Sequence, residues 1–155
     1  MKKTLTILFF AVIVAFFSSC KDDFDDSPFR CKINGKEFST SDDLLMVTIS
    51  GNEDNFYIQA TRVSVPLSSA LYGEIKLDIV VDSLGTYPLN LQNTWRWSNN
   101  GGQTYRANGV EQGTVTITQL DHGSQRISGT FELIAVGDDG STKTVSEGFF
   151  DSKWN

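Results

Sequence analysis

Residues that commonly perform catalysis are scarce in this chain, which has one histidine and two cysteines among 155 residues. The histidine, His122, lies in Asp121-His122-Gly123, a combination typical of a surface turn. A Ser-His-Asp triad would have to use His122 as its general base. A lone turn histidine is more often exposed and without a chemical role, so we expect no catalytic residue and no enzyme activity.

The composition also argues against a metal centre or a bound cofactor. A structural zinc site needs several cysteine or histidine ligands, and the chain lacks them. Asp138 and Asp139 stand beside Gly140 without the alternating acids and distal glutamate of a calcium loop. Segment 99–102, Asn-Asn-Gly-Gly, lacks the lysine and helix that follow a phosphate-binding loop. We expect no metal and no cofactor; carboxylates paired from distant strands for glycoside cleavage stay open.

Cys20 has the surroundings of a residue that is chemically modified. It follows two lysines, a largely apolar run over residues 5–17 and two serines, the pattern of a secretory signal. That run is shorter than the ~20 residues of a transmembrane helix. Phe17-Ser18-Ser19-Cys20 resembles the lipobox of bacterial lipoproteins, with phenylalanine where leucine is commoner. The resemblance implies acylation of the Cys20 thiol and its freed amine, and two or more acyl chains attach a protein firmly to a membrane.

The segment after Cys20 is acidic, with four aspartates between Lys21 and Pro28. It has too little apolar surface to fold, so residues 20–28 are predicted to form a flexible tether between the signal, residues 1–19, and a domain over residues 29–155. Lys21-Asp22-Asp23 resembles the export signal of Bacteroidota lipoproteins, a lysine followed by two acids. It implies display at the cell surface on the outer membrane; an ordinary solvated linker is the alternative.

The charge of the mature chain limits its partners. Removal of residues 1–19 takes away Lys2 and Lys3 and leaves 11 basic and 19 acidic residues, a net charge of −8. Nucleic-acid binding rewards clustered lysine and arginine, so we expect no nucleic-acid partner. We expect contact with the membrane through the lipid anchor alone.

The second cysteine, Cys31, is left without a disulfide partner if Cys20 is acylated. It alternates with Phe29 and Ile33 in a short predicted strand. We expect it to be a small buried apolar residue rather than a reactive thiol.

The rest of the chain predicts β-structure, because apolar residues alternate with polar ones and glycine-rich turns separate the segments. Asn34-Gly35 predicts a type I′ hairpin, and a bulge is expected near Glu147-Gly148, where the alternation changes phase. We expect an all-β fold, an antiparallel meander of about nine short strands that closes as a barrel or a sandwich. The predicted strands cover residues 29–33, 36–38, 45–50, 56–62, 71–82, 85–89, 94–98, 103–107, 113–120, 126–136 and 143–154.

One predicted hairpin combines aromatic and basic side chains. Trp95 and Trp97 are two residues apart and share a face of their strand. Exposed rings there would stack on a sugar while arginines bind its hydroxyl groups; in the alternative, the rings belong to the core. The candidate ligand site comprises Trp95, Arg96, Trp97, Tyr105 and Arg106.

Several short motifs resemble a family of Bacteroidota lipoproteins of unknown function. They are the hexapeptide Ile-Asn-Gly-Lys-Glu-Phe at 33–38, Gly-Thr-Val-Thr-Ile-Thr at 113–118 and Ile-Ser-Gly-Thr-Phe at 127–131. The tripeptide at 85–87 and the ending at 148–154 also fit. The resemblance covers the mature domain and implies a fold but no activity and no catalytic residue.

Two classes of function remain on this evidence. In the first, the protein is a surface-exposed binding or accessory module for a glycan, a peptide or a small apolar ligand. In the second, it is an interaction or structural lipoprotein with no small-molecule site. Exposure of the tryptophans distinguishes the two classes.

Overall fold

The computed structural model describes residues 27–40, 45–49, 54–62, 73–90, 94–99, 102–107, 109 and 112–154. The regular elements in these ranges are all strands, which confirms the all-β prediction. They number eleven, one for each predicted segment, which is slightly more than the nine or so strands expected for the meander. No helix in the described ranges is long and apolar enough to cross a membrane. The strands are β1 (Phe29–Ile33), β2 (Lys36–Thr40), β3 (Leu45–Ile49), β4 (Asn55–Arg62), β5 (Gly73–Val80), β6 (Gly85–Pro88), β7 (Thr94–Asn99), β8 (Thr104–Ala107), β9 (Gly113–Asp121), β10 (Arg126–Gly137) and β11 (Thr142–Lys153).

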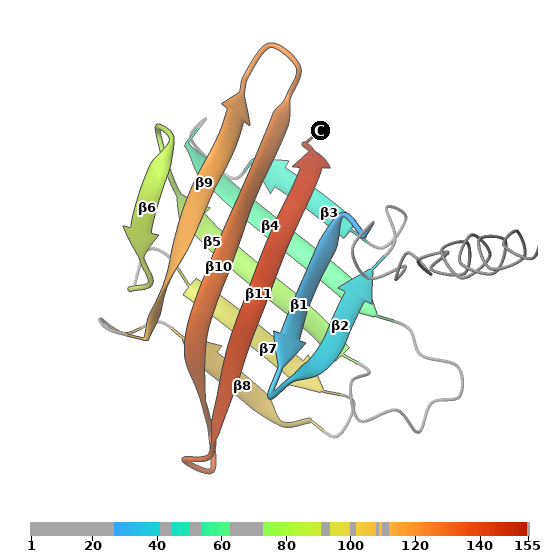
Figure 1. Ribbon diagram of the computed structural model, residues 1–155, viewed down its shortest axis with the longest axis vertical. Coiled ribbons are helices and arrows are strands. Elements are labelled where there is room, and N and C mark those ends of the chain that lie inside the picture. Colours follow the sequence, from blue (N-terminus) through green and yellow to red (C-terminus); the bar gives the residue numbers. More distant parts are fainter. Residues whose placement is uncertain are drawn as a thin grey trace, which may run out of the picture.

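All strands belong to one antiparallel sheet in the order β2-β1-β11-β10-β8-β7-β5-β4-β3, and β6 and β9 branch from β10. The sheet folds over itself into two crossing layers, a nearly closed barrel (Figure 1). The first layer contains β6, β9, β10, β11, β1 and β2, and the second contains β3, β4, β5, β7 and β8. The Thr40 hydroxyl donates to the Thr61 carbonyl over 2.6 Å, which joins β2 to β4 where the barrel closes.

The topology departs from a simple meander at three places, and one of them is β6, which pairs with β9 while β5 pairs with β7. The first strand pairs with the last, because β1 lies between β2 and β11. The long strand β10 pairs with β9 over most of its length and with β8 only at Val136 and Gly137. These pairings supply neighbours to strand edges that would otherwise be open to other chains.

Local backbone geometry agrees with the predicted turn and bulge. Asn34 and Gly35 have φ of 50° and 75°, as a type I′ hairpin requires. Glu147 has φ of 52°, and β11 shifts register there against both β10 and β1. The Lys32 ammonium lies 2.7 Å from a carboxylate oxygen of Glu147, so an ion pair holds the bulge against β1.

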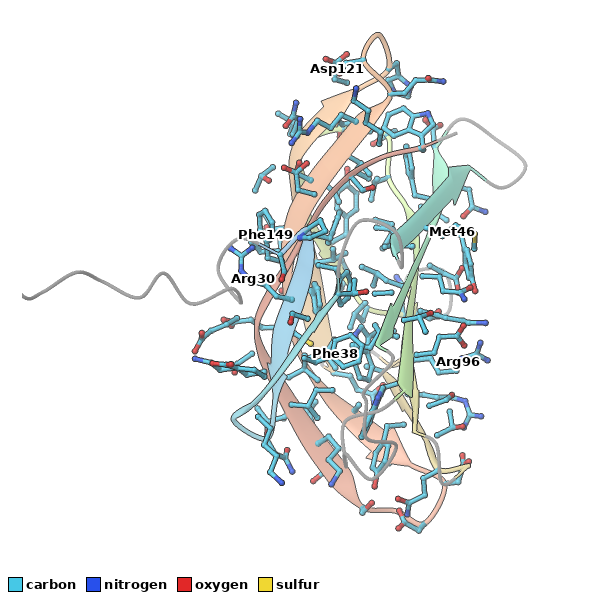
Figure 2. All side chains as sticks on the ribbon, turned by 90° about the vertical axis from the view of Figure 1, so that its right-hand side faces the viewer. Arg30, Phe38, Met46, Arg96, Asp121 and Phe149 are labelled. Carbon is cyan, nitrogen blue, oxygen red and sulfur yellow. The ribbon has the colours of Figure 1, made fainter. Side chains whose placement is uncertain are left out.

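The core lies between the two layers and is built from the inward residues of each strand. Figure 2 shows Phe38 between the layers, Arg30 and Phe149 outside the first layer, and Met46 and Arg96 outside the second. In β5 the alternate residues Ile75, Leu77 and Ile79 are fully buried, which agrees with the alternation of apolar and polar residues in the predicted strand 71–82. The predicted strand ended at Asp82, but β5 ends at Val80; residues 71 and 72 lie outside the described ranges.

Glycines in β10 and β11 allow aromatic rings to lie across the sheet. Gly148 pairs with Phe131, and Gly129 pairs with Phe150. A Cβ atom at either glycine would collide with the ring of its own partner and with a backbone oxygen. Glycine at these positions therefore lets two phenylalanines cover the strand backbone and fill the core.

Candidate functional site

The aromatic residues of the β7–β8 hairpin belong to the core. Trp95 is 0% exposed, and Trp97 and Tyr105 are each 3% exposed. Trp95 pairs with Leu77, and Trp97 pairs with Ile75. Both indoles of β7 therefore lie on the same inward side of the sheet as these apolar residues of β5. The prediction of an exposed aromatic surface was therefore wrong, and the alternative of buried rings is correct. The physical reason is the apolar partner strand, which decides which face of β7 turns inward.

The two arginines of the predicted site lie on the opposite face of the hairpin. Arg96 and Arg106 are exposed and pair with each other across β7 and β8. Side chains alternate between faces along a strand, so these guanidinium groups point away from the indoles next to them. The five predicted residues thus form two separate groups, an aromatic cluster inside and a basic pair outside.

The two indole nitrogens are enclosed by protein. Trp95 Nε1 and Trp97 Nε1 are the buried side-chain donors of the described residues that have no hydrogen-bond partner. Neither nitrogen has appreciable accessible surface, so no space for a water molecule adjoins either atom. These orphan donors reduce stability, since an unsatisfied buried polar group costs ~1–3 kcal/mol. They do not mark a preformed ligand cavity.

Tyr105 ends the aromatic cluster with a set of polar contacts. Its ring stacks on Trp97 with centroids 5.5 Å apart. Its hydroxyl donates to Gln103 Oε1 over 3.3 Å and accepts from the Ser141 hydroxyl over 3.2 Å. The Lys143 ammonium lies 5.2 Å from the ring centroid. These bonds tie the Tyr105 hydroxyl to Gln103 and Ser141, so its polar end takes part in a structural network.

The two acids considered for calcium are engaged within the protein. Asp138 forms an ion pair with Arg106. Asp139 accepts from the backbone amide of Ser141 over 2.9 Å and from its hydroxyl over 2.6 Å, and the hydroxyl bond lowers the pKa of Asp139. In the part of the chain that the structure describes, no group of three or more His, Cys, Asp or Glu residues is placed to hold a metal.

His122 lies exposed in the β9–β10 turn. Its ring contacts Trp154 edge-to-face, with centroids 5.7 Å apart. The neighbouring Asp121 carboxylate accepts from the Gly123 and Ser124 amides and from the Ser124 hydroxyl. These bonds tie Asp121 to its own turn, and those to Ser124 lower its pKa most. The geometry matches a structural turn.

Cys31 lies in the core, whereas the residues of the predicted anchor lie outside the described part of the chain. Cys31 is a free cysteine and 0% exposed, and burial raises the pKa of its thiol, so it is the small core residue predicted. Cys20, Lys21, Asp22 and Asp23 lie outside the described residues.

The predicted tether meets the domain before its expected end. The Pro28 carbonyl accepts from the Asp151 amide over 2.8 Å. The Ser27 carbonyl accepts from the Arg30 guanidinium over 3.0 Å. The last two residues of the segment predicted as tether are therefore bonded to β11 and β1.

A basic row crosses the outside of the second layer. Lys76 of β5 pairs with Arg96 of β7, and Arg96 pairs with Arg106 of β8. Lys76 Nζ lies 3.2 Å from the Glu74 carboxylate, and hydrogen bonds to Tyr57 and Glu74 raise its pKa. Lys76 was not among the predicted site residues, because it comes beside the arginines only through the pairing of β5 with β7 and of β7 with β8. The outward alternation of Glu74, Lys76 and Asp78 was the available signal.

An ion pair between Asp151 and Arg126 lies outside the first layer, on the opposite side of the domain from the basic row. Asp151 accepts from Arg126 Nε over 2.7 Å, from a terminal Arg126 nitrogen over 2.6 Å and from the Ser128 hydroxyl over 2.7 Å. The bonds from Arg126 are the main cause that lowers the pKa of Asp151. This bidentate pair is internally satisfied.

The fold and its outer faces define an all-β domain without an identified reaction centre. The model of a family described as a domain of unknown function, DUF6252, matches residues 21–152. The chain belongs to this family, which confirms the predicted membership of an uncharacterised domain family. No curated protein and no solved structure matches the chain.

Proposed function

We propose that this protein is a lipoprotein of the Bacteroidota outer membrane, attached through Cys20 and displayed at the cell surface. Its all-β domain acts there as a binding module that contacts a macromolecule with the outside of its sheet. Contact with a macromolecule on the outer face is favoured over a carrier that encloses a small apolar ligand. No enzyme activity is proposed.

The packed interior is the observation that carries this proposal. Large side chains from both layers meet between them, including Trp95, Phe131 and Phe150, all at most 2% exposed. Affinity for an enclosed ligand would require these rings to move apart, at the cost of the contacts that stabilise a close-packed core. Groups able to meet a partner without rearrangement lie on the outer faces.

The anchor and the display rest on the sequence. The run before Cys20 has the features of a lipoprotein signal, and Lys21-Asp22-Asp23 has those of a surface export signal. The family match begins at Lys21, directly after the predicted acylated residue. The domain begins close behind, because Ser27 and Pro28 already bond to it.

Protease shaving of intact Bacteroidota cells tests display, and labelling with radioactive palmitate tests the anchor. We expect the native protein to be labelled and degraded by external protease. Replacement of Lys21, Asp22 and Asp23 by alanine should keep the label but protect the protein, while Cys20→Ala should abolish the label.

The controls separate the two parts of the proposal. Lysed cells show that the protease can cleave each variant. Native protein that resists shaving but is cleaved after lysis would refute surface display. Undiminished labelling of Cys20→Ala would refute the anchor.

A further inference from the structure

The basic row places three positive charges on adjacent strands of an acidic protein. Lys76, Arg96 and Arg106 are direct cross-strand neighbours, about 5 Å apart at their Cβ atoms in such pairs. Like charges directly opposite one another destabilise a sheet. Ion pairs with Glu74 and Asp138 offset the charges of Lys76 and Arg106, so the charge of Arg96 is the one that an anion on this face would balance.

The middle member of the row, Arg96, has no counter-charge among the residues that the structure describes. Lys76 has Glu74, and Arg106 has Asp138. Among the described residues, no carboxylate is within ion-pair distance of Arg96. Its side chain is exposed and points outward from the second layer (Figure 2). A planar guanidinium in this setting can bind one carboxylate, sulfate or phosphate group through two parallel hydrogen bonds.

Hydroxyl groups surround Arg96 on the same face. Thr94 and Ser98 stand two residues to either side of it, and the Ser98 hydroxyl is 3.4 Å from that of Thr104. Thr94 donates weakly to Asp78 Oδ2, at 3.4 Å. Next to Lys76, Gln59 adds an amide that bonds to Glu74. Hydroxyl and amide groups can both donate and accept, which suits the hydroxyl groups of a sugar.

The position of the row within the sheet argues against a peptide. β5 pairs with β4 and β7, and β7 pairs with β5 and β8, so neither strand has a free edge. A peptide that binds by strand addition needs such an edge for its main-chain hydrogen bonds. Only side chains can bind a ligand on this face. This favours a ligand with polar groups around its outside, such as a carbohydrate with its hydroxyl groups.

The row also lies on the far side from the entry of the chain. Ser27 bonds to Arg30, and Arg30 lies outside the first layer, opposite Arg96 (Figure 2). If the domain is anchored through Cys20, the face with Arg96 is directed away from the tether. This orientation, though not the chemistry of the row, rests on the proposed function.

We propose that the basic row binds an acidic polysaccharide, with the Arg96 guanidinium taking the carboxylate of a uronic-acid residue. Thr94, Ser98 and Gln59 contact hydroxyl groups of the same chain. Lys76 and Arg106 remain paired with their own carboxylates and border the Arg96 site on either side. Because Arg96 is the cation of the row without an ion pair among the described residues, one carboxylate at one subsite is sufficient for recognition.

The test is retention of the detergent-extracted full-length protein on immobilised polygalacturonate at low ionic strength. Neutral dextran, dextran sulfate and polyglutamate serve as comparison polymers. We expect at least a tenfold preference for polygalacturonate over dextran, and loss of that preference in Arg96→Gln. Arg96→Lys should retain part of the binding, since it keeps the charge but loses the bidentate geometry.

Arg30→Gln is the matched control, because it removes the same charge from the outside of the other layer and should change retention less than twofold. Lys76→Gln provides a second variant of the row, with an expected loss of a few fold. Equal retention of native protein and Arg96→Gln would overturn the proposal, as would equal retention on dextran. Stronger retention on polyglutamate or dextran sulfate than on polygalacturonate would assign the row to another anion and refute the uronate. Protease shaving is independent of this assay, so failed surface display and failed glycan binding are distinguishable.

Discussion

Two arginines on the two outer faces show how differently the same side chain can be used in this fold. Arg126, outside the first layer, makes two bonds to Asp151, whose carboxylate also accepts from Ser128. Arg96, outside the second layer, has Lys76 and Arg106 as its cross-strand neighbours. The first arginine contributes to the stability of the domain through this ion pair, whereas the second has no ion-pair partner among the described residues. An exposed cation without an internal partner is a candidate for contact with another molecule.

A second contrast lies within one strand, between the two faces of β7. Trp95→Ala should cause the largest loss of stability among the changes considered, about 3–5 kcal/mol, because it empties the space of a fully buried indole. Urea unfolding followed by circular dichroism measures this difference. A loss below about 1 kcal/mol would mean that the indole is not packed in the core.

Gly148→Ala should be the next most damaging change. Its added methyl group would collide with the Phe131 ring and backbone, and overpacking of this kind costs about 1–3 kcal/mol. Gly123→Ala is a suitable control, since its Cβ would meet only the Asp121 carboxylate, at 3.3 Å. Equal thermal stability of the two variants would contradict the close approach of β10 and β11.

Asp151→Asn removes the carboxylate that pairs with Arg126, so the stability of this variant should depend on pH less than that of the native protein. The bonds from Arg126 lower the pKa of Asp151 in the folded protein, below the ~3.9 of an unfolded chain. The ionised carboxylate therefore stabilises the fold above about pH 4, and this contribution is lost as the pH falls further through the lowered pKa.

The pair is partly solvated, so we expect Asp151→Asn to cost about 1 kcal/mol at neutral pH. Unfolding measured from pH 6 to pH 2 should show a smaller loss on acidification in the variant than in the native protein. Glu132→Gln, on an exposed residue of β10, the strand that carries Arg126, serves as the control. If the free energy of unfolding changed with pH in the same way for native protein and Asp151→Asn, the ion pair of Asp151 with Arg126 would not stabilise the fold.

Arg96→Gln should have the smallest effect on stability. Removal of a cation from between two others relieves repulsion, so the free energy of unfolding should stay within about 0.5 kcal/mol of the native value or rise slightly. Thermal unfolding at low and high salt provides the measurement. A substantial destabilisation would show that Arg96 has a structural role, and would remove the contrast with Arg126.

Alternation along single strands carried most of what the sequence could predict. It identified Ile75, Leu77 and Ile79 as one buried face and located the change of phase near Glu147. It also implied that Arg96 faces away from Trp95, although the candidate site combined them. Which face turns inward depends on the partner strands, and here β5 supplies the apolar neighbours of both tryptophans.

The pairing of strands distant in sequence lay beyond that kind of reasoning. β1 pairs with β11, and Lys76 reaches the arginines only through the registers of β5 with β7 and of β7 with β8. No local pattern encodes a register between segments about 20 residues apart or more, because it is fixed by the packing of the whole sheet. The basic row is a product of that packing.

Tryptophan emission tests the central claim most directly, namely that the aromatic side chains are core and that partners meet the outside of the sheet. Trp154→Phe leaves Trp95 and Trp97 as the reporters. We expect blue-shifted emission that acrylamide quenches weakly and that polygalacturonate or a small apolar ligand leaves unchanged. Emission at long wavelength that a bound ligand shifts or quenches would contradict it, because the indoles would then face solvent and contact the ligand themselves.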